Sequence, residues 1–285
     1  MKTAVLGLGR MGRAVARRLH QQGYPVTGWN RNPGPAQALA DEGIATTATA
    51  AEAVAAAEAV VLLLSDAEAI ESALSSAIAS LDGRLIVQMG TIGSRESRAL
   101  AGRVGEAGGI YVEAPVLGSL PEARTGQLLV MVGGEPAHFE RALPLLRSLG
   151  QSPQRIGVVG QAAALKLAMN QLIAGLTATF SISLGLVRRE GIAVDQFMAL
   201  LRDSALYAPT FDKKLDKYLT HGYGNANFSL EHLLKDVRLF LQAAEPHRLD
   251  TAALTAVEAA CVRGIAVGHG DDDYSALYEA LVPRE

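Results

Sequence analysis

Cysteine is nearly absent from this chain of 285 residues, in which Cys261 stands alone. A single cysteine excludes an internal disulfide framework and any metal site built from several cysteines, and it is typical of a reducing, cytoplasmic compartment. The flanking residues, EAA and VRG, are typical of a buried helix. We therefore expect the Cys261 thiol to lie in a core.

A strong net charge is absent as well. The formal net charge of -3 and the pI near 6.1 provide no basic field that would attract nucleic acid or an anionic membrane, so a small-molecule ligand is favoured. No uninterrupted apolar run reaches the ~18 residues of a membrane-spanning helix. A strand-like segment directly after Met1 leaves no room for a signal peptide. These patterns predict a soluble, cytoplasmic protein that contacts no membrane.

Signatures of metal and hydrolase chemistry are also absent. The six histidines are scattered without metal-ligand spacing, and no G-x-S-x-G nucleophile motif occurs. The acidic run GDDD at 270–273 is more typical of a turn that begins a helix than of a metal site.

Strand and helix patterns alternate through the first half of the chain. The segments TAVLGL, PVTGWN, AVVLLL and RLIVQMG are each followed by a helical stretch, and GIYVEAP, QLLVMVGG and QRIGVV continue the series. Such alternation predicts parallel strands with helices on both faces. We expect an α/β fold whose first domain, residues 1–159, is a doubly wound, mainly parallel sheet.

The pattern changes after Gly160, where helix follows helix. The longest helix is expected over about 161–189, and its Ala, Leu, Ile and Met surface shows no clear solvent face. A helix that is hydrophobic all round is buried, here between two domains or two subunits. We therefore expect an all-helical second domain over 160–285 and a homodimer, or a tetramer built from dimers.

The first strand is followed by the glycine loop GLGRMG, which comprises Gly7, Leu8, Gly9, Arg10, Met11 and Gly12. Its glycines allow a tight turn, a close approach of the backbone to a pyrophosphate, and close packing of the next helix, whose N-terminal N–H groups face the phosphates. A G-x-G-x-x-G motif at the start of a βαβ pattern is a strong indication of dinucleotide binding.

The end of the second strand indicates which dinucleotide binds. A protein that binds NAD usually has an acidic residue there for the adenosine ribose, but this strand ends with Asn30 and Arg31. A guanidinium suits a phosphate, so we expect NADP(H), with NAD(H) less favoured. The alternative is that Arg31 is a solvated loop cation.

Two later strand ends carry SD and GTIGS. Because ligands of an open parallel sheet bind beyond the carboxyl ends of its strands, Leu64, Ser65 and Thr91 are candidates to line the cofactor path. Asp66 and Ser94 are better explained as helix N-caps.

Four segments together resemble the β-hydroxyacid dehydrogenase family, which includes 3-hydroxyisobutyrate dehydrogenases and glyoxylate/succinic semialdehyde reductases. They are GLGRMG, EAPVLGS at 113–119, GQAAALKLAMNQ at 160–171 and LLKDVRL at 233–239. The WNR ending of the second strand is most similar to the NADPH-using glyoxylate and succinic semialdehyde reductases. The resemblance implies a Rossmann domain, a long connecting helix and an all-α domain, with the active site in the cleft between them.

The resemblance also assigns roles to residues. It places a catalytic lysine at Lys166, a substrate-contacting asparagine at Asn170 and a cofactor-side lysine at Lys235. The loop at Leu117, Gly118 and Ser119 is expected to bind the substrate carboxylate. In the segment around LLKDVRL, Phe228 is expected to line the cleft and Asp236 to orient a neighbouring group. Many family members have serine where this chain has Leu117. The backbone N–H groups of Gly118 and Ser119, or the Ser119 hydroxyl, would have to compensate, and a more apolar substrate is favoured.

The residues themselves support carbonyl chemistry. Hydride transfer to a carbonyl builds negative charge on its oxygen, which the ammonium of a buried lysine can attract and protonate. Lys166 and Asn170, four positions apart, lie on one face of a helix, so the amide can orient the substrate or the ammonium. The alternative for Lys166 is an ammonium that extends to solvent, and for Lys235 it is a surface ion pair with Glu231 or Asp236.

Three functions remain open. The expected one is an NADP-preferring oxidoreductase that acts on the CH–OH group of a small hydroxy acid or reduces the corresponding aldehyde or keto acid. An imine reductase is the nearest rival, although the presence of Lys166 favours the carbonyl substrate. A non-catalytic NADP-binding sensor or scaffold is supported only by the departure at Leu117.

Overall fold

The computed structural model describes residues 1–283 and contains two compact units, Met1–Leu167 and the part that begins at Ala168. The boundary between them falls inside a long helix. The sequence pattern had placed it at 159/160, where the last strand ends.

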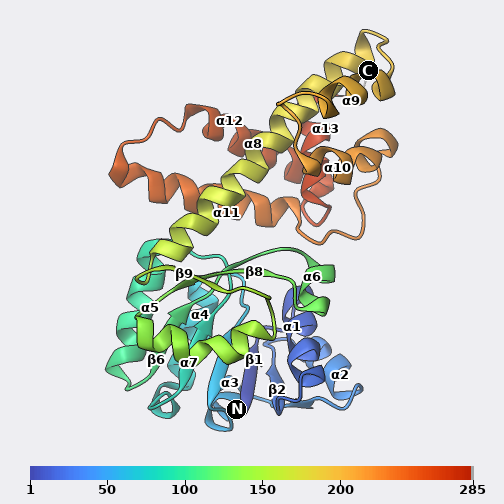
Figure 1. The fold of residues 1–285 in the computed structure, drawn as a ribbon. Coiled ribbons are helices and arrows are strands. Elements are labelled where there is room, and N and C mark those ends of the chain that lie inside the picture. Colours follow the sequence, from blue (N-terminus) through green and yellow to red (C-terminus); the bar gives the residue numbers. More distant parts are fainter. Residues whose placement is uncertain (284–285) are drawn as a thin grey trace. The chain divides into compact units, whose positions relative to one another are not determined.

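The first unit is built around a nine-stranded sheet (Figure 1). Its strands are β1 (Thr3–Leu6), β2 (Val26–Trp29), β3 (Ala45–Thr46), β4 (Ala59–Leu62), β5 (Leu85–Gln88), β6 (Ile110–Glu113), β7 (Val116–Leu117), β8 (Leu129–Gly133) and β9 (Gln154–Gly157). They are ordered β3-β2-β1-β4-β5-β6-β8-β7, and β9 pairs with β8. The strands from β3 to β6 are parallel, whereas β8 is antiparallel to both β6 and β7. The mainly parallel sheet expected from the sequence is confirmed.

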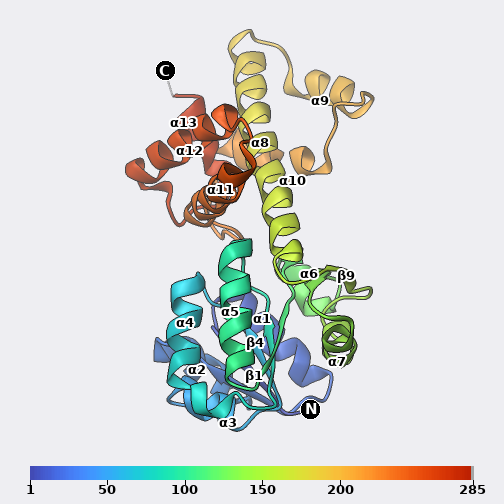
Figure 2. The same cartoon turned by 90° about the vertical axis from the view of Figure 1, so that its left-hand side faces the viewer.

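Helices cover both faces of the sheet (Figure 1, Figure 2). One face packs against α1 (Arg10–Gln21), α2 (Pro33–Ala40), α6 (Leu120–Thr125) and α7 (Pro136–Arg147), and the other against α3 (Ala50–Ala55), α4 (Ala67–Ser76) and α5 (Ser94–Glu106). Side chains alternate between the two cores, so that Val5 and Val61 enter the first while Leu6 and Leu62 enter the second. Burial on both faces explains why these strands are almost continuously apolar.

Helix α2 begins with Pro33, one residue after its N-cap Asn32. Proline fits the first turn of a helix because its missing N–H would have no partner there.

The second unit is helical, and no strand of the sheet lies among residues 168–283. Its helices are α8 (Gln161–Arg189), which begins in the first unit, α9 (Val194–Arg202), α10 (Pro209–Thr220), α11 (Leu230–Ala244), α12 (Ala252–Gly264) and α13 (Leu277–Leu281). The Phe180 and Phe211 rings stack with centroids 4.5 Å apart in one of its cores. Cys261 is buried in the other, and burial raises the pKa of its thiol to about 12, as the expected core position implies.

Helix α8 has the bounds expected from the sequence, and it corrects one expectation. By length and mean hydropathy it is able to cross a membrane, because an average over 18 residues tolerates the polar positions that interrupt any continuous apolar run. Half of this apolar window is buried inside the protein, as in the core helix of a globular fold. One such helix is weak evidence for a membrane.

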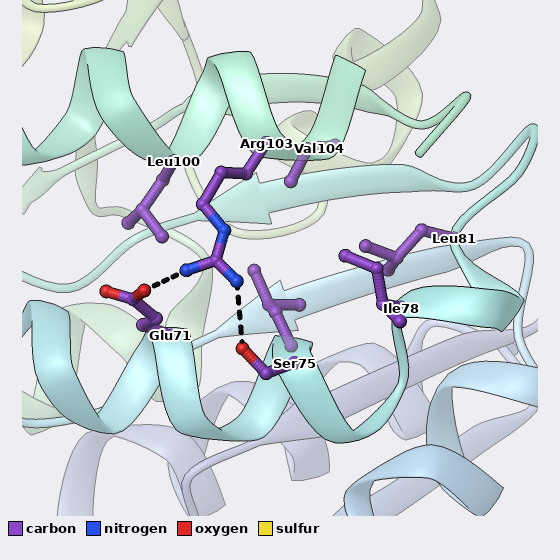
Figure 3. A pocket seen from close by; sticks show the side chains of 8 residues that line it. Glu71, Ser75, Ile78, Leu81, Leu100, Arg103 and Val104 are labelled. Atoms are coloured by element: carbon purple, nitrogen blue, oxygen red, sulfur yellow. Dashed lines mark hydrogen bonds and ion pairs between the residues drawn. The ribbon is translucent and has the colours of Figure 1, made fainter. Parts of the chain in front are cut away.

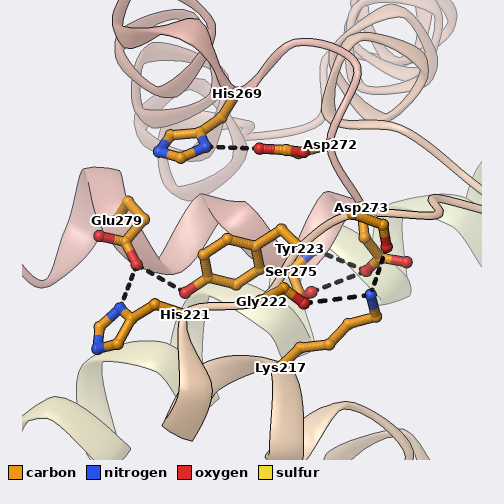
Figure 4. Close-up of polar contacts among 10 residues, drawn as sticks. Lys217, His221, Gly222, Tyr223, His269, Asp272, Asp273, Ser275 and Glu279 are labelled. Carbon is orange, nitrogen blue, oxygen red and sulfur yellow. Dashed lines mark hydrogen bonds and ion pairs between the residues drawn. The ribbon is translucent and has the colours of Figure 1, made fainter.

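Polar contacts fix the last turns of the helical unit (Figure 4). The Tyr223 hydroxyl donates to Glu279 Oε1 at 2.7 Å, and His221 Nδ1 lies 2.5 Å from the same oxygen. In the GDDD run, Asp273 accepts hydrogen bonds from the Ser275 N–H and hydroxyl at the start of a short 3-10 helix. The expected helix-starting turn is confirmed. Among residues 1–283 no group of three histidine, cysteine or acidic side chains is arranged to hold a metal ion.

Candidate functional site

The order of the strands reverses beside β1. From β1 the chain moves outward through β2 and β3, then returns to β4 on the other side of β1. Ligands of open α/β sheets bind at such a reversal, beyond the carboxyl ends of the strands. The loops after β1 and β4 touch there, since a Cβ on Gly7 would lie 2.4 Å from the Leu63 carbonyl oxygen.

Each glycine of the loop has a distinct reason to be glycine. Gly7 has φ +94°, in the left-handed region, and Gly12 packs so closely that a Cβ would lie 1.8 Å from the Gly7 carbonyl oxygen. At Gly9 a Cβ would meet nothing within 4 Å. Gly7 therefore shapes the turn and Gly12 lets α1 pack close to it. The open space at Gly9 lets a pyrophosphate approach the backbone at the helix N-terminus. The loop fits a dinucleotide.

The other residues of the loop divide between the core and the surface. Leu8 is fully buried, Met11 packs partly buried against the same core, and Arg10 is exposed as the first residue of α1.

Asn30 is joined to the glycine loop by a hydrogen bond. Its Oδ1 accepts from the Leu8 N–H at 2.9 Å, and its Nδ2 donates to the Asn32 carbonyl at 3.0 Å. The structure thus brings Asn30 to the loop as a brace. Arg31 is exposed and makes no hydrogen bond or ion pair within residues 1–283, which leaves its guanidinium available to a phosphate.

The loops after β4 and β5 also lie together. A Cβ on Gly90 would be 2.9 Å from the Leu64 carbonyl oxygen, and Leu64 and the neighbouring Thr91 are half-buried. The Ser65 hydroxyl donates to Asp66 at 2.7 Å. The structure thus places all three candidate cofactor residues at the carboxyl ends of adjacent strands.

The two expected helix caps have different outcomes. Asp66 caps α4 by accepting from the Ala69 N–H at 2.8 Å, as predicted. Ser94 was wrongly assigned: Gly93 is the cap and Ser94 is the first residue of α5. Here Glu96 reaches back to accept from the Gly93 N–H at 2.7 Å, so no capping hydroxyl is required.

A small cavity between α4 and α5 lies apart from these loops (Figure 3). Arg103 crosses it, pairs with Glu71 and donates to Ser75 at 3.0 Å. The cavity has a volume of about 10 Å³, which is enough for one water molecule and too small for a nucleotide.

Glu113, at the end of β6, is a further residue of this region that was not predicted, and it is only 1% exposed. Its Oε1 accepts from the N–H groups of Gly160, Ala162 and Ala163 at 2.8, 2.9 and 3.2 Å, which ties the first turn of α8 to the sheet. The Ser97 hydroxyl donates to Oε2 at 2.5 Å. An ionisable residue inside the otherwise apolar segment GIYVEAP was the available signal.

Lys166 and Asn170 are both buried on α8, with 9% and 3% of their surfaces exposed. This disfavours the alternative in which the lysine extends into solvent. The Asn170 Nδ2 donates to Asp236 Oδ2 at 2.5 Å, while its Oδ1 is buried without a hydrogen-bond partner. A buried amide oxygen of this kind is a ready acceptor for a bound group.

Asp236 joins two of the predicted site residues. Besides accepting from Asn170, it lies beside Lys235, whose Nζ is 2.7 Å from Oδ1 in an ion pair that lacks hydrogen-bond angles. The Asp236 side chain is 2% exposed. Lys235 thus pairs with a buried carboxylate, which distinguishes this pair from an ordinary surface ion pair.

The predicted carboxylate loop follows β7 and forms the start of α6. Gly118 has φ +128°, and Ser119 is the N-cap of α6. The Ser119 N–H donates to Glu122 at 2.6 Å, which corrects the expectation that this N–H is available to a substrate. The Ser119 hydroxyl is buried and has no hydrogen-bond partner. Leu117 pairs with Leu129 across the strands.

Phe228 lies within the helical unit, partly buried against its core. Its ring is 5.8 Å from that of Tyr274, between centroids, and 6.3 Å from that of His232. Its role as a substrate contact remains a prediction.

Two family models match the chain in succession. The NAD binding domain of 6-phosphogluconate dehydrogenase matches residues 2–161, and the NAD-binding domain of NADP-dependent 3-hydroxyisobutyrate dehydrogenase matches residues 160–281. The chain belongs to the β-hydroxyacid dehydrogenase family. As a member of that family it is an NAD(P)-dependent oxidoreductase that acts on hydroxyl or aldehyde groups of a small molecule.

Known relatives match the chain over nearly its whole length. Glyoxylate/succinic semialdehyde reductase 1 of Arabidopsis thaliana is 30% identical, over 99% of this chain and 98% of that protein. The structure of 3-hydroxyisobutyrate dehydrogenase from Mycobacterium tuberculosis, solved with L-serine, has a TM-score of 0.89 at 23% identity and covers 98% of both chains. An imine reductase from Myxococcus stipitatus, in complex with NADP⁺, has a TM-score of 0.68 at 24% identity, over 99% of this chain and 100% of that one.

Proposed function

We propose that this β-hydroxyacid dehydrogenase is an NADPH-dependent reductase of a small aldehyde or keto acid, of the glyoxylate, succinic semialdehyde or 3-hydroxyisobutyrate type, with Lys166 as its general acid/base. The observation that carries the proposal is the burial of Lys166 one helical turn before Asn170 on α8. A buried ammonium stabilises an oxyanion more than a solvated one does, because water does not screen it.

The bound nicotinamide supplies the hydride. Lys166 then has two tasks during reduction: its ammonium attracts the carbonyl oxygen as negative charge develops, and it gives that oxygen the proton that completes the alcohol. In oxidation the neutral amine takes the same proton from the hydroxyl. Asn170 hydrogen-bonds the substrate through its amide, which the contact with Asp236 keeps in one orientation.

NADP(H) is the proposed cofactor because the end of β2 carries a cation in place of a carboxylate. Arg31 is exposed, and Asn30 is held against the glycine loop. A guanidinium favours a 2′-phosphate, whereas a carboxylate would repel it. Lys235 is proposed as a further cofactor contact.

The substrate type is proposed from the relatives named glyoxylate/succinic semialdehyde reductases and from the loop at Leu117. The Ser119 hydroxyl supplies one donor to a carboxylate. Leu117 supplies none, and Glu122 already binds the Ser119 N–H. These features favour a substrate whose carboxylate is held by few donors.

The test is NADPH oxidation with glyoxylate, succinic semialdehyde, methylmalonate semialdehyde and cyclic imines. Turnover of an aldehyde that falls ~10²- to 10⁴-fold in Lys166→Ala, at unchanged NADPH affinity, is expected because a general acid contributes that factor. Lys213→Ala removes an exposed lysine from α10 and serves as the control. Reduction of imines alone would favour the imine reductase, and tight NADPH binding without turnover would favour a sensor; either outcome contradicts the proposal.

A homodimer is proposed from the exposed face of α8. Leu172, Ile182 and Leu186 are 52%, 56% and 62% exposed along one uncharged side of this helix. Exposed apolar patches of this extent mark protein contacts. Light scattering of the wild type and of Leu172→Glu will show whether the mass falls to that of one chain in the variant.

A further inference from the structure

We propose that Glu113 is a positioning residue for Lys166, because it fixes the residue at which α8 begins. The inference rests on the proposed role of Lys166. Glu113 is a buried carboxylate that lies outside the glycine loop and takes no part in the proton transfer proposed for Lys166.

The contacts of Glu113 differ from those of an ordinary helix cap. A cap side chain normally precedes its helix by one residue, whereas Glu113 lies 47 to 50 residues earlier in the chain and still accepts three N–H groups from the first turn of α8. Charge-assisted bonds to several backbone N–H groups, at the positive end of a helix, satisfy a buried carboxylate without a cation. The carboxylate therefore holds the helix start against the end of β6.

Backbone packing keeps the oxygen that faces α8 in place. A Cβ on Gly133 would be 2.2 Å from Oε1, so the backbone of β8 packs directly against this oxygen. Ser97 donates to the other oxygen, Oε2, and the Tyr111 hydroxyl lies 2.9 Å from Ser97 Oγ.

The register of α8 determines the direction of Lys166. An α-helix turns by about 100° per residue, so a start displaced by one residue would rotate Lys166 by about that angle around the helix axis. Lys166 follows Ala163, the last residue bonded to Glu113, by only three positions. The same glutamate ends β6 just before Leu117, at the head of the proposed substrate loop. The three bonds from the Glu113 carboxylate thus set the direction in which the Lys166 side chain leaves α8.

The experiment compares Glu113→Gln and Glu113→Ala with Ser97→Ala. Glu113→Ala is expected to lower kcat by ~10²-fold, because small misplacements of a catalytic group cost that much. Glu113→Gln keeps the shape and is expected to fall between it and the wild type, so the proposal remains testable if the alanine variant does not fold. The dissociation constant for NADPH should be unchanged in both variants, because Glu113 bonds to Ser97 and to the start of α8 and not to the glycine loop.

Ser97→Ala is the matched control, because it removes a bond from the other oxygen of the same carboxylate and leaves the three bonds to α8. Hydrogen exchange at the amides of Gly160, Ala162 and Ala163 should be faster in the Glu113 variants and unchanged in Ser97→Ala. Equal loss of kcat in Ser97→Ala and Glu113→Gln, or unchanged exchange in the Glu113 variants, would overturn the inference. Faster exchange with full turnover in Lys166→Ala would instead mean that the proposed function is wrong.

Discussion

Asn170 and Asp236 share a buried hydrogen bond of 2.5 Å between α8 and α11. The bond is made by a neutral amide to a carboxylate that also lies beside Lys235. Three polar side chains from two helices are therefore held in one arrangement. Asp236 is the member that touches both of the others.

Asp236→Asn is expected to lower kcat/KM by about tenfold. Asparagine can still accept from Asn170, but the carboxylate charge is lost, and the difference between a charged and a neutral hydrogen bond, ~1 to 1.5 kcal/mol, corresponds to about a factor of ten in rate. Steady-state kinetics will measure this, with Glu231→Gln on the same helix as a control that leaves the Asn170 contact intact. Wild-type kinetics in Asp236→Asn would mean that Asn170 needs no support.

Arg31→Ala is expected to change cofactor preference. Without the guanidinium, KM for NADPH should rise by at least about tenfold, as for the loss of a charge-assisted bond to a phosphate, while KM for NADH stays nearly constant. Both constants are measured with one substrate, and Arg263→Ala removes an exposed arginine from α12 for comparison. An unchanged ratio of the two KM values would mean that Arg31 is a solvated loop cation and does not bind the cofactor.

Gly9→Ala and Gly7→Ala should separate binding from folding. At Gly9 the added methyl meets no protein atom, so Tm should be unchanged while NADPH affinity falls because the methyl occupies the approach of the pyrophosphate. Gly7→Ala combines positive φ, a cost of ~1 to 2 kcal/mol, with a clash against the Leu63 carbonyl, so Tm should fall too. Calorimetry and ligand titration measure the two effects. Unimpaired NADPH binding in Gly9→Ala would contradict this account of the loop.

Leu117→Ser should shift the substrate profile toward short acids. The new hydroxyl adds a donor beside Ser119, so kcat/KM for glyoxylate is expected to rise by about tenfold, the value of one hydrogen bond of ~1 to 1.5 kcal/mol. Leu117→Ala tests whether smaller size alone is enough. Equal gains in both variants would assign the change to space rather than to hydrogen bonding.

Asp212 should contribute to the acid stability of the helical unit. Hydrogen bonds from Arg202 and Tyr207 lower the pKa of its carboxyl from 3.8 to about 2. Because the folded value lies below the unfolded one, the stabilisation is present above the unfolded value and is lost as the pH falls through the folded one. The Tm of Asp212→Asn should therefore approach that of the wild type as the pH falls from about 4 to about 2. A constant difference across this range would exclude the linkage.

Periodicity was sufficient for the elements that carry most of the fold. The long parallel strands are apolar because both of their faces are buried, and α8 is a long, mostly apolar segment, so their positions followed from the sequence. Strands β3 and β7 have only two residues each, and two residues define no alternation. They form because a neighbouring strand offers unpaired backbone groups, which the sequence does not display.

Some residues of the site were likewise predictable from the sequence and others were not. The glycine loop was predictable because the positive φ of Gly7 and the contact of Gly12 with the Gly7 carbonyl arise within one short motif. Glu113 was not, because its partners lie in the first turn of α8, far along the chain. The N–H of Ser119 was misjudged for a similar reason, since the carboxylate that takes it belongs to Glu122 in the following turn.

Because β1, β4, β5 and β6 are parallel, their amino ends lie on one side of the sheet and their carboxyl ends on the other. The turns that enter β5 and β6, at Gly83 and Gly108, lie at the amino ends, opposite to the glycine loop. A peptide tag or a fluorophore inserted at Gly83 would therefore leave coenzyme affinity intact. That turn is a suitable attachment point for immobilising the enzyme or for following single molecules optically.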